Sequence, residues 1–276
     1  MFAGFNLEIT ENSKINFGLY KELGKNHLGN QKAEFKKKME DYLVNGIVNG
    51  TQIEKDWFPL IEADIFISHS HADEALANGI AGWLNTQFGL KCFVDSCVWS
   101  YSDDLLEMIN SSFSNKREDT NGGYLYDHQK CNTASKHVNI MLSVALQKMI
   151  DKTEATILLN TTNSISRYSN VYEDATYSPW IYSEIVCTQI VRRKPLSKYR
   201  KEGVILEHAS EGVQMRYDSN EFKAAYEITL DHLIALDENS LLMWENIVNS
   251  KEFCYPLDYL YRITNPDKMW TLGNRL

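Results

Sequence analysis

The feature that most constrains the fold is an alternation of strand, helix and strand between residues 62 and 95. Residues 62–70 form a short apolar run that leads into a polar loop, as expected of a buried strand. Apolar residues then recur at helical spacing over 72–89, and a second apolar run over 90–94 ends at Asp95. A unit of this kind joins parallel strands through a right-handed crossover. The sequence therefore predicts an α/β fold built on a parallel sheet.

The same alternation continues downstream, after a long interruption. Residues 138–149 carry an amphipathic helical pattern and lead into a third apolar strand at 155–159. Between the second strand and that helix, residues 96–137 hold one predicted helix, around Leu105, and a stretch rich in Gly, Asn and Lys. Connections this long in a compact domain are usually functional or disordered. We therefore expect a long loop insertion at 96–137, which would serve as a lid.

The two ends of the chain carry weaker patterns. Residues 1–60 contain one predicted helix, from Gln31 to about Val48, and are otherwise polar, so we expect a partly helical N-terminal extension. Near the other end, Val204-Ile205-Leu206 is a candidate fourth strand and Tyr226–Leu230 a half-buried one, followed by one or two late helices. The expected organisation is an extension at 1–60 and a domain at 61–276, with a core at 61–195 and a C-terminal completion at 196–276.

The sequence predicts the start of a helix at Ser178-Pro179-Trp180-Ile181-Tyr182-Ser183-Glu184. The Ser178 hydroxyl can accept a hydrogen bond from a backbone N–H of the first turn, and Pro179 suits the first helical position. Trp180 and Glu184 are four residues apart and therefore share one helix face. A carboxylate near the carboxyl edge of a parallel sheet lies where such sheets bind ligands. On its own, the stretch is better explained as the start of a plain amphipathic helix than as part of a ligand site.

The composition fits a soluble globular protein. The chain has 276 residues, of which 43% are hydrophobic and 24% charged, and its net charge of −9 disfavours broad binding to nucleic acid or anionic membrane. The five cysteines are an odd number without C-x-x-C spacing, which is typical of reduced thiols. The first residues lack a basic region followed by an apolar one, and no uncharged run of about 18 residues occurs. We expect a cytoplasmic protein with neither nucleic-acid nor membrane partners.

Several common catalytic and binding motifs are absent from the sequence. Neither the dinucleotide fingerprint G-x-G-x-x-G nor the P-loop occurs, and there is no G-x-S-x-G nucleophile elbow. His69 and His71 are two residues apart, but no cysteine or carboxylate has the spacing that would complete a closed metal site. We therefore expect no metal, and we interpret the two histidines as part of a polar loop that lines a ligand cleft.

Taken in order, four of these stretches resemble a TIR (Toll/interleukin-1 receptor) domain. They are Asp64-Ile65-Phe66-Ile67-Ser68-His69-Ser70-His71-Ala72-Asp73, Phe93-Val94-Asp95, Ile157-Leu158-Leu159-Asn160 and Ser178 to Glu184, and together they span about residues 61–195. The resemblance implies a flavodoxin-like fold, with a central parallel sheet flanked by helices. Bacterial TIR proteins of this kind cleave NAD+ at the nicotinamide–ribose bond, giving nicotinamide with ADP-ribose or cyclic ADP-ribose. Several act in antiphage (abortive infection) defence, as in Thoeris-type systems.

The resemblance also implies roles for individual residues. Glu184 falls on the family's catalytic glutamate, and Trp180 falls on the tryptophan that precedes it. The positions implied to line the NAD+ site are Ser68, His69, Ser70, His71 and Asp95. Trp180, together with Trp99 or Tyr101 from the long insertion, is a candidate to stack on nicotinamide or adenine; the alternative for each is a plain core aromatic residue.

One carboxylate is enough for this chemistry. Cleavage of the bond builds oxocarbenium character on the ribose, and nicotinamide departs neutral without an acid, whereas ordinary glycosidases need a pair of carboxylates. Glu184 would hydrogen-bond the ribose hydroxyls and stabilise the developing positive charge. NAD+ is then a substrate, and no cofactor is expected. Neither hydrolysis nor cyclisation is favoured by the residues.

Two other functions remain open. A non-catalytic TIR interaction module that signals by self-assembly is favoured by the absence, at Ser70 and His71, of the basic residues that the family's enzymes often carry there. Another glycosyl-transfer enzyme on a similar sheet, such as a nucleoside deoxyribosyltransferase, is more distant. Either TIR hypothesis implies a homo-oligomer, and a cyclic product implies a downstream effector that senses it.

Overall fold

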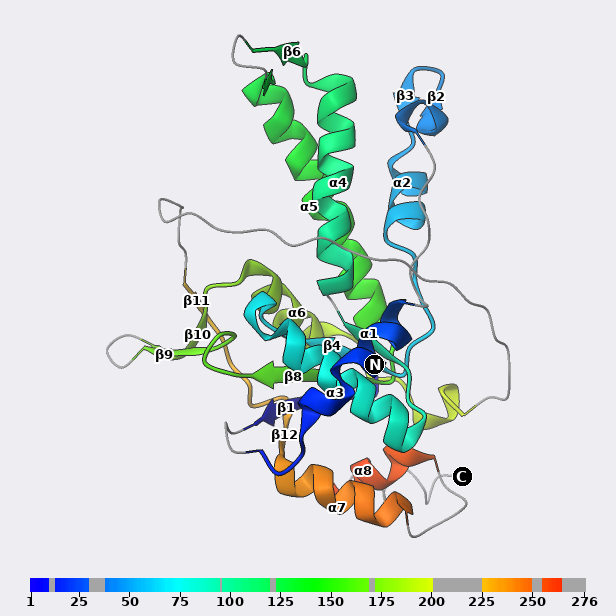
Figure 1. Cartoon of the computed structure of the whole chain (residues 1–276), viewed down its shortest axis with the longest axis vertical. Coiled ribbons are helices and arrows are strands. Elements are labelled where there is room, and N and C mark those ends of the chain that lie inside the picture. The colour runs from blue at the N-terminus through cyan, green and yellow to red at the C-terminus, as the bar shows by residue number, and fades with distance from the viewer. Residues whose placement is uncertain are drawn as a thin grey trace.

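The centre of the molecule is a five-stranded parallel sheet with the strand order β12-β1-β8-β4-β5 (Figure 1). The computed structural model describes residues 1–9, 13–29, 38–94, 96–119, 123–168, 172–200, 225–249 and 255–264. The strands of the sheet are Ala3–Glu8 (β1), Ile65–Ser68 (β4), Cys92–Val94 (β5), Ala155–Asn160 (β8) and Ile234–Asp237 (β12). Helices flank the sheet on both faces, which confirms the predicted α/β class and is consistent with a flavodoxin-like fold.

The three strands predicted first along the chain are all present. β4, β5 and β8 lie within or close to the apolar runs at 62–70, 90–94 and 155–159, and β4 pairs with both of the others. The helix between β4 and β5, α3 (Glu74–Phe88), ends as predicted at Gly89, whose φ of 67° is the left-handed conformation that favours glycine at a helix end. The strand–helix–strand unit is therefore confirmed.

The N-terminus supplies a strand of the sheet that the sequence analysis did not predict. β1 lies between β8 and β12, with Phe5 opposite Ile157 on one side and Ile234 on the other. Read from β5 across the sheet, β5, β4 and β8 follow the order 2-1-3 that begins the common flavodoxin-like order 2-1-3-4-5, and the N-terminal strand β1 occupies the fourth place, where that order has a later strand. The expected boundary at residue 60 thus separates β1 from the sheet to which it belongs.

One face of the sheet is covered by α3 together with α1 (Lys21–Gly29), α7 (Glu238–Asn249) and α8 (Pro256–Thr264). Alternate strand residues, among them Phe5, Ile65 and Ile157, point to this face and are buried. Helix α3 packs so closely against α1 and the 3-10 turn before it that a Cβ atom on Gly82 would lie 2.1 Å from the carbonyl oxygen of Tyr20 in that turn. Glycine is therefore required at Gly82.

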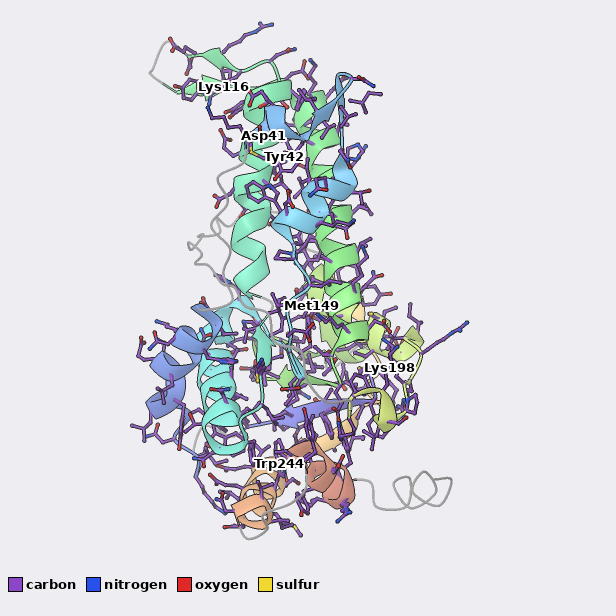
Figure 2. The ribbon with its side chains drawn as sticks, turned by 90° about the vertical axis from the view of Figure 1, so that its right-hand side faces the viewer. Asp41, Tyr42, Lys116, Met149, Lys198 and Trp244 are labelled. Carbon is purple, nitrogen blue, oxygen red and sulfur yellow. The ribbon has the colours of Figure 1, made fainter. Side chains whose placement is uncertain are left out.

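The other face is covered by α6 (Pro179–Ile190) and by part of α5 (His128–Lys152). Here Phe66 and Phe93, from neighbouring strands, pack beneath Leu146 and Met149 of α5. Helix α5 has 25 residues, so it is about 37 Å long and extends well past the sheet. Figure 2 shows Met149 at the level of the body, with the rest of α5 continuing away from it.

The segment expected as a long loop at 96–137 is largely helical and forms an arm that projects from the body (Figure 1). The arm consists of α4 (Ser96–Phe113), a small hairpin of β6 (Arg117–Glu118) and β7 (Tyr124–Leu125), and the first half of α5. Helix α5 begins ten residues before the predicted pattern because Asp127 caps it, accepting from the backbone N–H groups of Gln129 and Lys130. The prediction of a long loop is therefore wrong, the helix predicted around Leu105 is confirmed as part of α4, and the role as a lid stays a prediction.

Residues 38–57 lie along this arm. The helix predicted from Gln31 to Val48 is wrong over its described part, 38–48, which holds a short 3-10 helix, η2 (Met39–Tyr42), and a hairpin of β2 (Leu43–Val44) and β3 (Ile47–Val48). Asn45 and Gly46 both have positive φ, as in the two-residue turns that join such hairpins. Helix α2 (Gly50–Trp57) follows and packs on α5 through the buried Ile53. Figure 2 shows Tyr42 beside the arm.

The remaining elements are short strands and short 3-10 helices. The polar segment after β8 contains β9 (Ser166–Tyr168) and β10 (Tyr172–Thr176), which form a small sheet with β11 (Tyr226–Glu227). Three short 3-10 helices are η1 (Phe17–Tyr20), η3 (His71–Asp73) and η4 (Leu196–Lys198). The candidate strand at 204–206 lies outside the described residues. No helix in the described part of the chain is long and apolar enough to cross a membrane.

Candidate functional site

The polar ends of β4 and β8 lie side by side at the carboxyl edge of the sheet. The two strands are neighbours, with Ser68 opposite Leu158. From β4 the chain continues to β5 on one side, whereas from β8 it continues through α6 to β12 on the other side. Connections that diverge from adjacent parallel strands open a crevice in which ligands bind. The fold therefore places a candidate site at the ends of β4 and β8.

A buried hydrogen bond joins the two stretches that carry most of the sequence argument. The Ser68 hydroxyl, at the end of β4, donates to Oε2 of Glu184 in α6 at 2.5 Å, across 116 residues of sequence. Both side chains are only 2% exposed. A carboxylate in such a position is held in place by its hydrogen bonds, because burial of a charge is otherwise costly. Glu184 is thus fixed beside the end of β4, at the carboxyl edge of the sheet.

The position of Glu184 follows from how α6 begins and packs. The Ser178 hydroxyl accepts from the backbone N–H of Ile181 at 3.2 Å, and Pro179 is the first helical residue, so the predicted cap is confirmed. Ile181 and Ile185, both buried, pack against Leu158 of β8. These contacts hold α6 over the sheet and orient the neighbouring carboxylate toward β4.

The tryptophan of the same motif lies half-buried, one helical turn before Glu184. Trp180 packs against the apolar cluster between α5 and the sheet, which includes Cys187 and Phe66. Its contact with the body is therefore at least partly structural. Whether its exposed part also stacks on a ligand stays a prediction.

The cysteine nearest to Glu184 is chemically quiet. Burial, with the negative charge of Glu184 as a smaller cause, raises the pKa of Cys187 to about 11. A thiol with such a pKa is protonated at neutral pH and is a poor nucleophile. This agrees with the interpretation of Cys187 as an inert core residue.

The loop after β4 brings some predicted residues to the site and leaves others at the surface. His69 is 1% exposed and lies within the protein next to Ser68. Ser70 is half-buried and precedes η3, whose first residue, His71, is exposed. The loop therefore divides into a buried half, which carries Ser68 and His69, and an outer half, which carries Ser70 and His71.

The remaining predicted residues lie beyond what the structure describes. Asp95 falls outside the described residues. Trp99 is part of helix α4, but its side chain, like that of Tyr101, is not described. Their predicted contacts with a substrate therefore stay predictions.

Sequence reasoning missed a set of hydrogen bonds that joins the loop after β4 to the loop after β8. The Thr161 hydroxyl donates to Oδ2 of Asp73 at 2.5 Å, and the Asn163 amide donates to Oδ1 at 2.8 Å. Asp73 is only 9% exposed. The sequence does show that both loops are polar and follow neighbouring strands. It does not show which of their side chains form hydrogen bonds with each other. We call these three residues the Asp73 lock.

Within the described residues, no group of three or more His, Cys, Asp or Glu side chains is arranged to hold a metal ion. The chemistry in reach of the crevice is a fixed carboxylate, a hydroxyl donor and an imidazole. Such groups bind the hydroxyl groups of a ligand and stabilise positive charge that develops on it.

Comparison of the chain with protein-family models, with characterised proteins and with solved structures finds no match in any of the three. The resemblance to TIR domains therefore rests on the residues described above.

Proposed function

We propose that the protein is a TIR-type enzyme that cleaves the nicotinamide–ribose bond of NAD+, with Glu184 as the catalytic residue. One observation carries the proposal above the others: the hydrogen bond of 2.5 Å between Ser68 and Glu184. It joins the two motifs on which the resemblance depends, at the crevice where a parallel sheet binds its ligands. Products are nicotinamide and either ADP-ribose or its cyclic form.

In this mechanism, Glu184 acts on the ribose. Its carboxylate accepts hydrogen bonds from the ribose hydroxyls and stabilises the oxocarbenium character that develops as the bond to the positively charged nicotinamide breaks. The electron pair of the broken bond goes to nicotinamide, which leaves as a neutral molecule. Water, or a nucleophile of the substrate itself, then bonds to the ribose carbon and its proton passes to solvent, giving ADP-ribose or a cyclic product.

The burial of Glu184 bears directly on this mechanism. Because the carboxylate is 2% exposed, the ribose reaches it only when neighbouring groups move. A ribose hydroxyl that donates to Oε2 would take the place of the Ser68 hydroxyl. In this mechanism, the hydrogen bond between Ser68 and Glu184 belongs to a resting state, and Ser68 keeps Glu184 in place until substrate binds.

A non-catalytic TIR interaction module is the second candidate, and one observation favours it. A carboxylate that is nearly inaccessible and bonded to a serine is also what a purely structural residue would look like. Both functions would operate through self-association, and the enzyme with a cyclic product would also need an effector that senses it. Antiphage defence is the setting that we propose for either.

Incubation of the purified protein with NAD+, with products resolved by chromatography and mass spectrometry, tests the proposal. We expect nicotinamide release that falls at least about a hundredfold in Glu184→Gln, because one preorganised electrostatic group is removed. Glu22→Gln, an exposed carboxylate on α1, is the matched control and should retain full activity. The mass of the second product separates ADP-ribose from cyclic ADP-ribose.

Expression in cells, with NAD+ measured in the lysate, covers the possibility that a cellular trigger is needed. A fall in NAD+ with the wild type, and none with Glu184→Gln at equal protein level, supports the enzyme. If wild type and variant leave NAD+ unchanged in both assays, the enzyme is refuted and the interaction module stands.

A further inference from the structure

A cavity of about 980 Å³ opens at the carboxyl edge of the sheet, beside the ends of β1 and β8. Its volume is at the upper end of the range typical of small-molecule sites. It lies next to the crevice between β4 and β8, but it is formed mainly by other segments: the end of β1, residues 13–18 and the turn at 160–166. The N-terminal strand therefore creates a hollow that the proposed NAD+ site does not use.

The walls of the cavity combine polar groups with an apolar surface. Ile15, Phe17 and Leu76 provide the apolar part. Glu8 and Asn160, which lie opposite each other at the ends of their strands, are on the polar side. Such a wall suits a molecule that has one apolar face and a rim of hydrogen-bonding groups.

Glu8 accepts one side-chain hydrogen bond from the described residues and keeps further accepting capacity. Its side chain is exposed, and the Asn160 amide donates to its Oε1 at a long 3.4 Å. A carboxylate offers about four acceptor positions on two oxygens. In parallel sheets, a carboxylate near a strand end is well suited to accept from the two adjacent hydroxyls of a ribose.

The charges around the cavity exclude anionic ligands. Its lining, taken over the residues that the structure describes, includes the two carboxylates Glu8 and Asp73 and contains no lysine, arginine or histidine. A phosphate would meet a negative potential there without a cation to offset it. Within the described residues, no group of three or more His, Cys, Asp or Glu side chains is arranged to hold a metal ion at this cavity.

We propose that this cavity binds an uncharged molecule with adjacent hydroxyl groups, a nucleoside or a free sugar, whose hydroxyls donate to Glu8. The apolar part of the wall takes the base or the C–H face of the sugar. The inference is independent of the proposed NAD+ cleavage, because no catalytic residue contributes to the cavity. It adds a second ligand site to the carboxyl edge of the sheet.

Isothermal titration calorimetry on the full chain, without NAD+, tests this site. The probes are adenosine, D-ribose and inorganic phosphate. Glu8→Gln removes the charged acceptor, and Thr162→Trp fills the cavity from an exposed position on its wall. Glu22→Gln is the matched control, and circular dichroism verifies that each variant is folded.

We expect the wild type and the control to bind adenosine, with about tenfold weaker binding in Glu8→Gln because a hydrogen bond to a charged group is lost. Binding should disappear in Thr162→Trp. Binding of adenosine and ribose alike would identify the sugar as the recognised part, and binding of adenosine alone would identify a nucleoside.

Three results would each overturn the inference: no binding of either neutral probe at millimolar concentration, equal binding by the wild type and Thr162→Trp, or binding of inorganic phosphate at this cavity. Repeating the titration with Glu184→Gln separates the two proposals, since loss of NAD+ cleavage should leave adenosine binding unchanged.

Discussion

Replacing Ser68 by alanine removes a hydroxyl that donates a hydrogen bond of 2.5 Å to Glu184. Both side chains are 2% exposed, so solvent cannot replace the missing donor without rearrangement of the site. A hydrogen bond to a charged group contributes about 1.5–3 kcal/mol to stability, and the buried setting favours the upper half of that range. We therefore expect Ser68→Ala to lower the free energy of unfolding by about 2–3 kcal/mol.

A double-mutant cycle separates this contact from other effects of the substitutions. The second change is Glu184→Leu, which removes both carboxylate oxygens and keeps a side chain of similar bulk. Once the carboxylate is gone, the serine has nothing charged to donate to, so the double variant should be less destabilised than the sum of the two single variants. Urea unfolding of the four proteins should give a coupling free energy of about 1–2 kcal/mol.

A matched pair on the surface of the arm provides the control. The Ser111 hydroxyl donates to Oε1 of Glu107 at 2.9 Å, in the same chemistry but in contact with solvent. Side-chain pairs four residues apart on an exposed helix contribute about 0.2–0.5 kcal/mol. If the coupling between Ser68 and Glu184 is no larger than that between Ser111 and Glu107, the inference that Ser68 fixes the carboxylate is refuted.

Three further outcomes follow from packing and protonation. Gly82→Ala should lose about 1–3 kcal/mol in urea unfolding, because its Cβ would lie 2.1 Å from a carbonyl oxygen of η1, whereas Gly29→Ala, with open space around it, should be nearly neutral. Thiol labelling followed by mass spectrometry should modify the partly exposed Cys131 well before Cys187, whose pKa is raised to about 11; equal rates would contradict the burial argument. Burial, with a smaller contribution from Lys91, lowers the pKa of His27 from 6.5, so the unfolded chain binds the proton more tightly. Stability present at neutral pH should therefore be lost as the pH falls below about 6.5, and His27→Gln should reduce that loss in unfolding experiments.

The sequence predicted the three strands of the sheet whose signals are local patterns. β4, β5 and β8 are runs of apolar residues bounded by polar loops, and α6 announces its start with Ser178 and Pro179. Each of these signals involves neighbouring residues only. That is why the ends of β4 and α6, and with them Ser68 and Glu184, were correctly identified as parts of the same edge of the sheet.

The elements that were missed have short or ambiguous patterns. Over Ala3–Glu8 the apolar residues alternate with Gly4, Asn6 and Glu8, which is the period of a strand with one buried face, but six residues near a chain end carry little weight. In the hairpin of β2 and β3, the Asn45-Gly46 turn was the stronger signal, and the helical spacing of the surrounding apolar residues obscured it. In the arm only the helix around Leu105 was predicted, because the first half of α5 packs on α4 and α2 in place of the sheet.

The hydrogen bond between Ser68 and Glu184 could not be read from local patterns, because it depends on which strands are neighbours. Ser68 lies next to α6 for two reasons. Strand β4 pairs with β8, and the isoleucines of α6 pack against Leu158 of β8. On the other side of β8, β1 occupies the place that a later strand would otherwise take. The chain after β8 therefore passes across β1 to β12, away from β4, and the connections from β4 and β8 diverge as a ligand crevice requires. The N-terminal strand, far from Glu184 in sequence, thus belongs to the sheet on which the candidate site is built.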